Sequence, residues 1–251
     1  MTIIFYDIPS DRVGAWSPNT WKTRFCLNFK GIPYKTEWVE YPDIAELSKK
    51  LGFKPTGKTP WDGTDYYSLP AIHDPSTGAY ISDSWEIAEY LEKQYPDTPT
   101  LFPNGTKGLQ AAIADGYHVA LGSLWAFILP ATNEILNSKS QGYFSRTRQL
   151  AFKVEKIQDL VPKGEKAVEE WGKLQSSLDK VDRWYAKTDD KGPFILGETI
   201  SWSDLNIASW TIWMKVTFGE DSKEWKDIAS WQGGRWSKLL VDLEKYSAKK
   251  D

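Results

Sequence analysis

Two serine-containing motifs in the first hundred residues have the residue types that bind anions at helix N-termini. Trp16-Ser17-Pro18-Asn19 opens one amphipathic helical pattern, and Asp83-Ser84 opens another. Unpaired backbone N–H groups at a helix N-terminus attract negative charge. The Ser17 hydroxyl could donate a hydrogen bond to a thiolate there, which would lower the thiol pKa from its usual value of about 8.5. The alternative is that Ser17 only caps its helix, as serine often does.

The second motif offers donors for a carboxylate and one acidic side chain. The N–H and hydroxyl groups of Ser84 would bind a ligand carboxylate, aided by the helix dipole. Asp83 could meet a ligand ammonium group, or it could cap the helix with Glu86 at capping-box spacing. Because both roles use the same carboxylate oxygens, the sequence leaves this choice open.

A third motif, Leu69-Pro70-Ala71-Ile72, places a proline inside an apolar run. Proline at the start of an edge strand is ordinary. A cis Leu69-Pro70 bond would instead turn the preceding N–H and C=O groups outward, where an extended peptide could pair with them. Lys54 and Lys58 precede this motif in a polar loop, and either could pair with a ligand carboxylate or simply be solvated.

These motifs require a small α/β scaffold, and the hydrophobic patterns predict one. The predicted elements are a strand at 3–8, a helix at 18–30, a strand at 34–40, a short helix ending at Gly52, a hairpin at 71–81 and a helix at 84–95. Trp21, Phe25 and Phe29 share one face of the first helix. Together these elements have the order βαβαββα of a small α/β domain.

Three prolines within residues 95–105 mark a linker, and strands all but vanish after it. Helical patterns follow at 107–136, 145–160, 165–187, 203–217 and 233–247. Ser201 and Asp204 have the capping-box spacing that predicts a helix start with a structural purpose. We therefore predict an α/β domain at 1–96, a linker at 97–105 and an all-helical domain at 106–251.

Composition narrows the classes of function. The net charge of −3 is spread along all 251 residues, so no basic stripe favours nucleic acid. No signal peptide is evident, and the longest nearly apolar run, 119–131, is too short to span a bilayer. One cysteine and two histidines are too few for a zinc site, and we interpret Cys26, His73 and His118 as structural. The sequence predicts a metal-free cytoplasmic protein.

Aromatic residues are abundant, with 14 Trp, 12 Tyr and 10 Phe. Most of them are expected to fill a large core. The excess also favours a pocket for flat, apolar ligands, because aromatic faces stack on aromatic rings. Trp16 is the candidate for such a pocket because it adjoins Ser17.

Taken together, the motifs resemble those of cytosolic glutathione transferases. The matching segments are Ser17-Pro18-Asn19-Thr20-Trp21-Lys22-Thr23-Arg24, Gly31-Ile32-Pro33-Tyr34, Leu69-Pro70-Ala71-Ile72, Asp83-Ser84-Trp85-Glu86-Ile87 and Ser201-x-x-Asp204. The first two segments together form one motif, and the resulting four motifs touch both predicted domains in this order. The Trp-Ser-Pro-Asn-x-Trp-Lys pattern and the long loop after Lys54 look most like the fungal and bacterial transferases related to lignin β-etherases.

The resemblance implies a thioredoxin-like first domain, an all-helical second domain and a homodimer. It implies that glutathione binds as co-substrate along the first domain and that a hydrophobic, aromatic electrophile binds between domains. It places Ser17 at the thiol-activating position with Asn19 assisting, and it places Lys58, Leu69, Pro70, Asp83 and Ser84 around glutathione. The chain departs from the omega-type pattern, which has cysteine where Ser17 stands, so thiol–disulfide exchange is disfavoured.

Three functions follow as hypotheses. The first is a serine-type glutathione transferase used in detoxification, with aryl-ether cleavage as one reaction open to it. The second is a ligandin that binds aromatic compounds with little or no catalysis. The third is an interaction module without chemistry.

Overall fold

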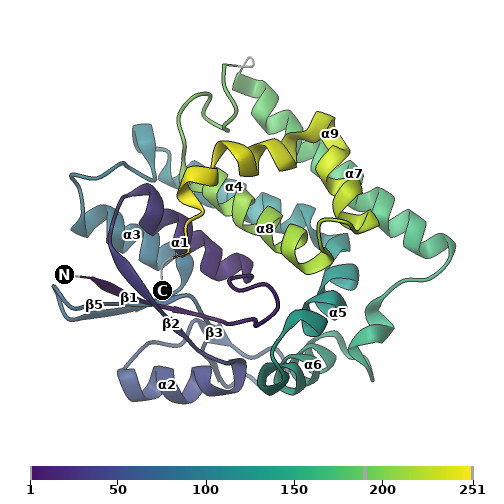
Figure 1. The fold of residues 1–251 in the computed structure, drawn as a ribbon, viewed down its shortest axis with the longest axis horizontal. Coiled ribbons are helices and arrows are strands. Elements are labelled where there is room, and N and C mark those ends of the chain that lie inside the picture. Colours follow the sequence, from purple (N-terminus) through teal and green to yellow (C-terminus); the bar gives the residue numbers. More distant parts are fainter. Residues whose placement is uncertain (1, 189–190, 250–251) are drawn as a thin grey trace. The chain divides into compact units, whose positions relative to one another are not determined.

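The computed structural model describes residues 2–188 and 191–249 (Figure 1). Residues 1, 189–190 and 250–251 of the predicted domains lie outside this description. The chain divides into two compact units that are discontinuous in sequence. Unit 1 contains Met1–Pro99, Asn133–Ile157 and Tyr246–Asp251, and unit 2 contains Thr100–Thr132 and Gln158–Lys245.

Unit 1 is built on a four-stranded mixed sheet, which confirms the predicted thioredoxin-like fold. The strand order is β2-β1-β5-β6, with β1 parallel to β2 and the other pairs antiparallel. Its strands are β1 (Ile3–Asp7), β2 (Tyr34–Trp38), β5 (Ala71–Asp74) and β6 (Ala79–Ser82). Inside the predicted polar loop at 54–68, β3 (Gly57–Lys58) and β4 (Asp65–Tyr66) form a separate two-stranded ladder.

Helices cover both faces of this sheet. In unit 1, α1 (Pro18–Phe29) and α3 (Ser84–Gln94) lie together on one face and α2 (Ile44–Leu51) lies on the other (Figure 1). Pro18 starts α1 because its missing N–H is not needed in the first turn. Gly31 then follows at φ 68°, and Pro33 prevents continuation. The predicted ends of α1, α2 and α3 therefore agree with the structure to within one residue.

Unit 2 is helical, as predicted for the second half of the chain. Its helices are α4 (Lys107–Ala120), most of α5 (Trp125–Ile135), α7 (Glu165–Tyr185), α8 (Trp202–Phe218) and α9 (Lys223–Asp242). Helix α8 is buried along nearly its whole length. Its first turn carries the predicted capping box, in which Ser201 and Asp204 satisfy each other's backbone groups.

Three predicted helices differ from the structure. The pattern at 107–136 is split by a turn at Leu121–Leu124, so it forms two helices. The helix predicted at 145–160 is wrong in its bounds, because α6 spans Ser138–Phe152 and ends where Lys153 adopts φ 56°. The last helix begins at Lys223 because the Ser222 side chain accepts a hydrogen bond from the Trp225 amide, a capping signal that the periodicity did not reveal.

The described residues were also compared with the requirements of membrane-spanning helices and of metal sites. No single described helix has the length and apolarity needed to cross a membrane. Segments Lys107–Ala120 and Gly122–Ile135, bent by 43° at their junction, meet the requirement only as a pair. Over residues 2–188 and 191–249, no group of three or more His, Cys, Asp or Glu side chains could hold a metal ion.

Candidate active site

The three sequence motifs meet at one edge of the unit 1 sheet. Strand β1 leads through a loop to Ser17, so its carboxyl end faces this edge. Because β5 runs antiparallel to β1 and Ala71 lies opposite Tyr6, Leu69-Pro70 lies beside that carboxyl end. The Asp83 amide donates to the Pro70 carbonyl at 3.2 Å, which places the start of α3 at the same edge. The sheet register therefore brings the start of α1 together with Leu69-Pro70 and the start of α3, which lie far from it in sequence.

Ser17 has the backbone of an N-cap residue but not its side-chain hydrogen bond. Its φ and ψ are −63° and 126°, and its carbonyl accepts hydrogen bonds from the Trp21 amide and the Thr20 hydroxyl. The Ser17 residue is only 3% exposed. Its hydroxyl does not cap α1 and forms no hydrogen bond within the described part of the chain. The simple capping role is therefore not the one that this hydroxyl fills.

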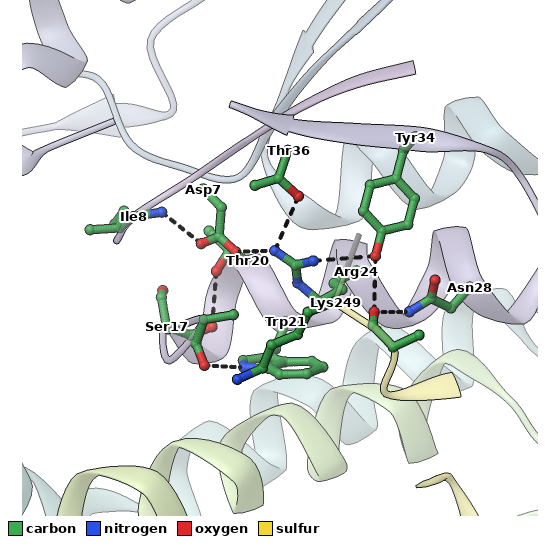
Figure 2. A network of polar contacts seen from close by, with 12 residues as sticks. Asp7, Ile8, Ser17, Thr20, Trp21, Arg24, Asn28, Tyr34, Thr36 and Lys249 are labelled. Carbon is green, nitrogen blue, oxygen red and sulfur yellow. Dashed lines mark hydrogen bonds and ion pairs between the residues drawn. The ribbon is translucent and has the colours of Figure 1, made fainter. Parts of the chain in front are cut away.

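A buried ion pair joins β1 and α1, the two elements on either side of the loop that carries Ser17 (Figure 2). Arg24 Nη2 lies 2.8 Å from Asp7 Oδ2, and both side chains are 0% exposed. The same guanidinium group donates to the Tyr34 hydroxyl at 3.2 Å and to Thr36 Oγ1 at 3.4 Å. Burial raises the pKa of the Asp7 carboxyl, and the adjacent Arg24 charge opposes that rise. The network ties the strand that leads to Ser17 to the helix that starts there.

The Leu69–Pro70 bond is cis, as one of the two sequence interpretations proposed. Leu69 is buried, and neither its amide nor its carbonyl is hydrogen-bonded within the described residues. A peptide-like ligand lying along this edge would find one donor and one acceptor not used by the sheet.

At the start of α3, the two carboxylate oxygens of Asp83 differ in their hydrogen bonds. Oδ1 accepts hydrogen bonds from the Trp85 amide at 2.8 Å and from the Glu86 amide at 3.3 Å, so it caps the helix. Oδ2 accepts no hydrogen bond from a described residue. Because the two oxygens are separate acceptors, helix capping and ligand binding do not compete, and the alternatives that the sequence left open are compatible. Ser84, the first residue of α3, is buried, and its N–H and hydroxyl make no described hydrogen bond.

Lys22 connects the two helix starts. Its ammonium donates to Asn19 Oδ1 at 3.0 Å, and its charge interacts with the Asp83 carboxylate. Burial lowers the Lys22 pKa to about 8, against the opposing influence of Asp83. Because lysine only donates hydrogen bonds, this contact requires the oxygen of the Asn19 amide to face Lys22. Lys22 lies within the first sequence motif, but nothing in that motif indicates a role for its side chain.

A cavity of about 490 Å³ adjoins the start of α3. Its wall includes Lys54, Thr56, Ser82 and Asp83. Lys54 is exposed, and no ion pair involving it is found within the described chain. Lys58 does not line this cavity, and its ammonium pairs with Asp65 at 2.6 Å on β4. Of the two loop lysines, Lys54 is therefore the one near the motif residues.

Trp16 is a core residue at this edge. Its side chain is only 2% exposed, and its ring lies 6.2 Å from that of Tyr41 at a tilt of 43°. Tyr41 in turn stacks on Tyr143 of α6, with ring centroids 6.0 Å apart. Burial raises the Tyr41 pKa. Tyr41 and Tyr143 were missed in sequence, because nothing local indicates that residues a hundred positions apart share one cluster.

Comparison with known proteins identifies the architecture. A family model described as the C-terminal domain of glutathione S-transferase matches residues 108–246, and one for the N-terminal domain matches residues 16–94. The chain belongs to the glutathione S-transferase family. Its thioredoxin-like N-terminal domain and all-helical C-terminal domain are those of this family of enzymes.

Similar transferases come from fungi. A glutathione S-transferase of Ceriporiopsis subvermispora, solved in complex with glutathione, is 47% identical over the full length of both chains, with a TM-score of 0.94. The transferase GSTFuA3 of Phanerochaete chrysosporium is 40% identical over 100% of this chain and 99% of its own, with a TM-score of 0.92. The glutathione S-transferase-like protein ustS of Aspergillus flavus is 32% identical over 94% of this chain and 87% of its own.

Proposed function

We propose that this glutathione transferase binds glutathione and activates its thiol with the Ser17 hydroxyl. The observation that carries the proposal is that this hydroxyl is unused by helix capping, at a helix N-terminus that shares one sheet edge with Leu69 and Ser84. A hydroxyl donor and local N–H groups favour the thiolate over the thiol. Asn19 contributes a second polar group within the first turn.

Glutathione lies along the sheet edge in this proposal. Its γ-glutamyl carboxylate binds the N–H and hydroxyl of Ser84, and its ammonium group binds the free Oδ2 of Asp83. Its peptide backbone pairs with Leu69 next to Pro70. A lysine binds the remaining carboxylate, and the cavity favours Lys54 over Lys58 for this role.

The thiolate then attacks an electrophilic carbon of a hydrophobic, aromatic co-substrate. A sulfur–carbon bond forms, and the leaving group departs with the electron pair of the bond that breaks. The protein contributes orientation and charge stabilisation rather than a covalent intermediate. Identities of 40–47% support a place among fungal transferases. The motif resemblance to transferases related to lignin β-etherases makes aryl ethers one class of electrophile that we propose to test.

Replacement of Ser17 tests the catalytic role. In Ser17→Ala we expect the thiol pKa of bound glutathione to rise by about one unit and kcat/KM with an aryl halide to fall about tenfold near neutral pH, since one hydrogen bond to a charged group is lost. The thiol pKa is read from the pH dependence of thiolate absorbance. An unchanged thiol pKa and pH–rate profile would remove Ser17 from the mechanism.

A second serine provides a matched control for stability. Ser222 caps α9 through its side chain, whereas Ser17 does not cap α1. Ser222→Ala is expected to lower the melting temperature and to leave the thiol pKa unchanged. Ser17→Ala is expected to raise the thiol pKa and to leave the melting temperature nearly unchanged.

A ligandin is the second candidate function, and the aromatic clusters favour it. Trp125, Trp210 and Trp213 pack within 5.5–5.9 Å of one another in unit 2. Quenching of tryptophan fluorescence by aryl ligands, measured beside turnover, separates the two functions. Tight aryl binding without glutathione turnover would support the ligandin. An increase of melting temperature with glutathione concentration would argue against an interaction module without a ligand.

We also propose a cytoplasmic homodimer. Leu109 and Val119 on α4 and Val168 on α7 are exposed apolar side chains that a partner subunit would cover. Light scattering coupled to size-exclusion chromatography tests the oligomeric state.

A further inference from the structure

The loop between β1 and α1, residues 8–17, carries Ser17 and is here called the serine loop. It has no regular secondary structure, so its path depends on individual hydrogen bonds. Ser10 Oγ donates to the Ile135 carbonyl at 2.6 Å and accepts from the amides of Arg12 and Val13. Trp21 Nε1 donates a hydrogen bond to the Ala15 carbonyl at 3.2 Å.

One side chain from outside the thioredoxin-like part of the chain also binds this loop and links it to a second segment. Asn137, the residue before α6, accepts the Asp11 amide on its Oδ1 at 2.7 Å. Its Nδ2 donates to Glu40 Oε1 at 2.9 Å and to Asp11 Oδ1 at 3.3 Å. The side chain thus joins the serine loop to the segment that follows β2.

An amide is the side-chain group that fits this arrangement. The backbone N–H of Asp11 requires an acceptor, and the two carboxylates of Asp11 and Glu40 require a donor. A carboxylate at this position would face two other carboxylates. The Asn137 side chain does not cap α6, so its contacts serve the serine loop and Glu40 rather than the helix that it precedes.

We propose that Asn137 is a positioning residue that sets the place of the Ser17 hydroxyl through the serine loop. This inference rests on the proposed function, in which Ser17 activates the thiol. Asn137 touches neither Ser17 nor the reacting atoms, and it acts by fixing the loop at Asp11. Displacement of a catalytic group by about 1 Å can cost up to about a hundredfold in rate.

The first experiment compares Asn137→Ala with a control on the helix that Asn137 precedes. In Asn137→Ala we expect kcat/KM to fall about tenfold and the thiol pKa of bound glutathione to rise by about one unit, because the Ser17 hydroxyl no longer sits at the sulfur. The KM for glutathione is expected to stay near that of the unaltered protein, since Ser84 and Leu69 hold the tripeptide. Lys139→Ala is the control: it cuts the ion pair of Lys139 with Asp43, another link from α6, but none to the serine loop.

Exchange of the donor and acceptor provides a second test. Asn137→Asp keeps the acceptor for the Asp11 amide but places a third carboxylate beside Asp11 and Glu40, so we expect a loss at least as large as in Asn137→Ala. In Asn137→Asp/Glu40→Gln the amide donor is restored at position 40, so the thiol pKa is expected to recover toward that of the unaltered protein.

Each outcome bears on the proposal. Combining Asn137→Ala with Ser17→Ala should add no further rise in thiol pKa, because both act through one hydroxyl. A variant Asn137→Ala that melts at a lower temperature but keeps the original thiol pKa and pH–rate profile would overturn the positioning role. If Ser17→Ala alone leaves the thiol pKa unchanged, the proposed function fails instead.

Discussion

Replacing Arg24 by methionine would leave the Asp7 carboxylate buried without its counter-charge. Arg24 and Asp7 are both fully buried, with 2.8 Å between their charged atoms. The guanidinium also lies 5.1–5.7 Å from the ring centroids of four aromatic side chains, Phe5, Trp21, Tyr34 and Trp38. Methionine suits the space among these rings because its thioether packs well against aromatic edges. The variant therefore removes the charge with little loss of packing.

The size of the effect depends on pH. Removing one member of a buried pair costs about 3–5 kcal/mol of unfolding free energy. The variant can avoid the bare charge by protonating Asp7, whose ordinary pKa is 3.8 and whose pKa burial already raises. Protonating such a group costs about 4 kcal/mol at about pH 7 and about 1 kcal/mol at about pH 4.5. We therefore expect the destabilisation relative to the unaltered protein to shrink by about 3 kcal/mol as the pH falls over this range.

Urea denaturation at the two pH values measures this difference. Asp7→Asn/Arg24→Met is expected to recover much of the loss at about pH 7, because neither charge is then present. Lys35→Met, which breaks the exposed pair of Lys35 with Glu37 on β2, serves as the control and is expected to leave the midpoint nearly unchanged. Equal destabilisation by Arg24→Met at both pH values would refute the electrostatic argument.

Two further predictions concern unit 2 and the ligand cavity. Burial raises the pKa of Asp204 from 3.8 to about 6, so its contribution to stability is complete below about pH 4 and is lost as the pH rises through about 6. Urea midpoints at about pH 4 and about pH 7 should show the unaltered protein losing up to about 3 kcal/mol relative to Asp204→Asn; parallel profiles would contradict this. For the ligand, Lys54→Ala is expected to raise the KM for glutathione about fivefold to tenfold, as for a partly exposed charge contact, whereas Lys58→Ala should change it less than twofold. Steady-state kinetics with varied glutathione tests the pair, and the reverse ranking would support the original assignment of Lys58.

The local patterns predicted the elements that position the site. The Pro18 start and the Gly31-Pro33 end define α1, and Asp83 at the N-cap defines α3, because capping and chain reversal depend on residues within one turn. Helical periodicity was less reliable in the second half. The helix predicted at 145–160 is α6 at Ser138–Phe152, and α9 contains non-helical residues from Trp231 to Gly234 that its pattern does not reveal.

The amino-acid sequence by itself determined which chemical groups this transferase presents: a serine and an acidic-serine pair at helix starts, a proline-interrupted strand and no second thiol. Tertiary structure decided how those groups are used. It left the Ser17 hydroxyl out of helix capping, divided the Asp83 oxygens between two tasks, paired Lys58 with Asp65 and brought Asn137 to the serine loop. The physical reason is that a side chain's hydrogen bonds and charge partners depend on which distant segments fold beside it. The spacing of residues along the chain does not indicate which segments those are.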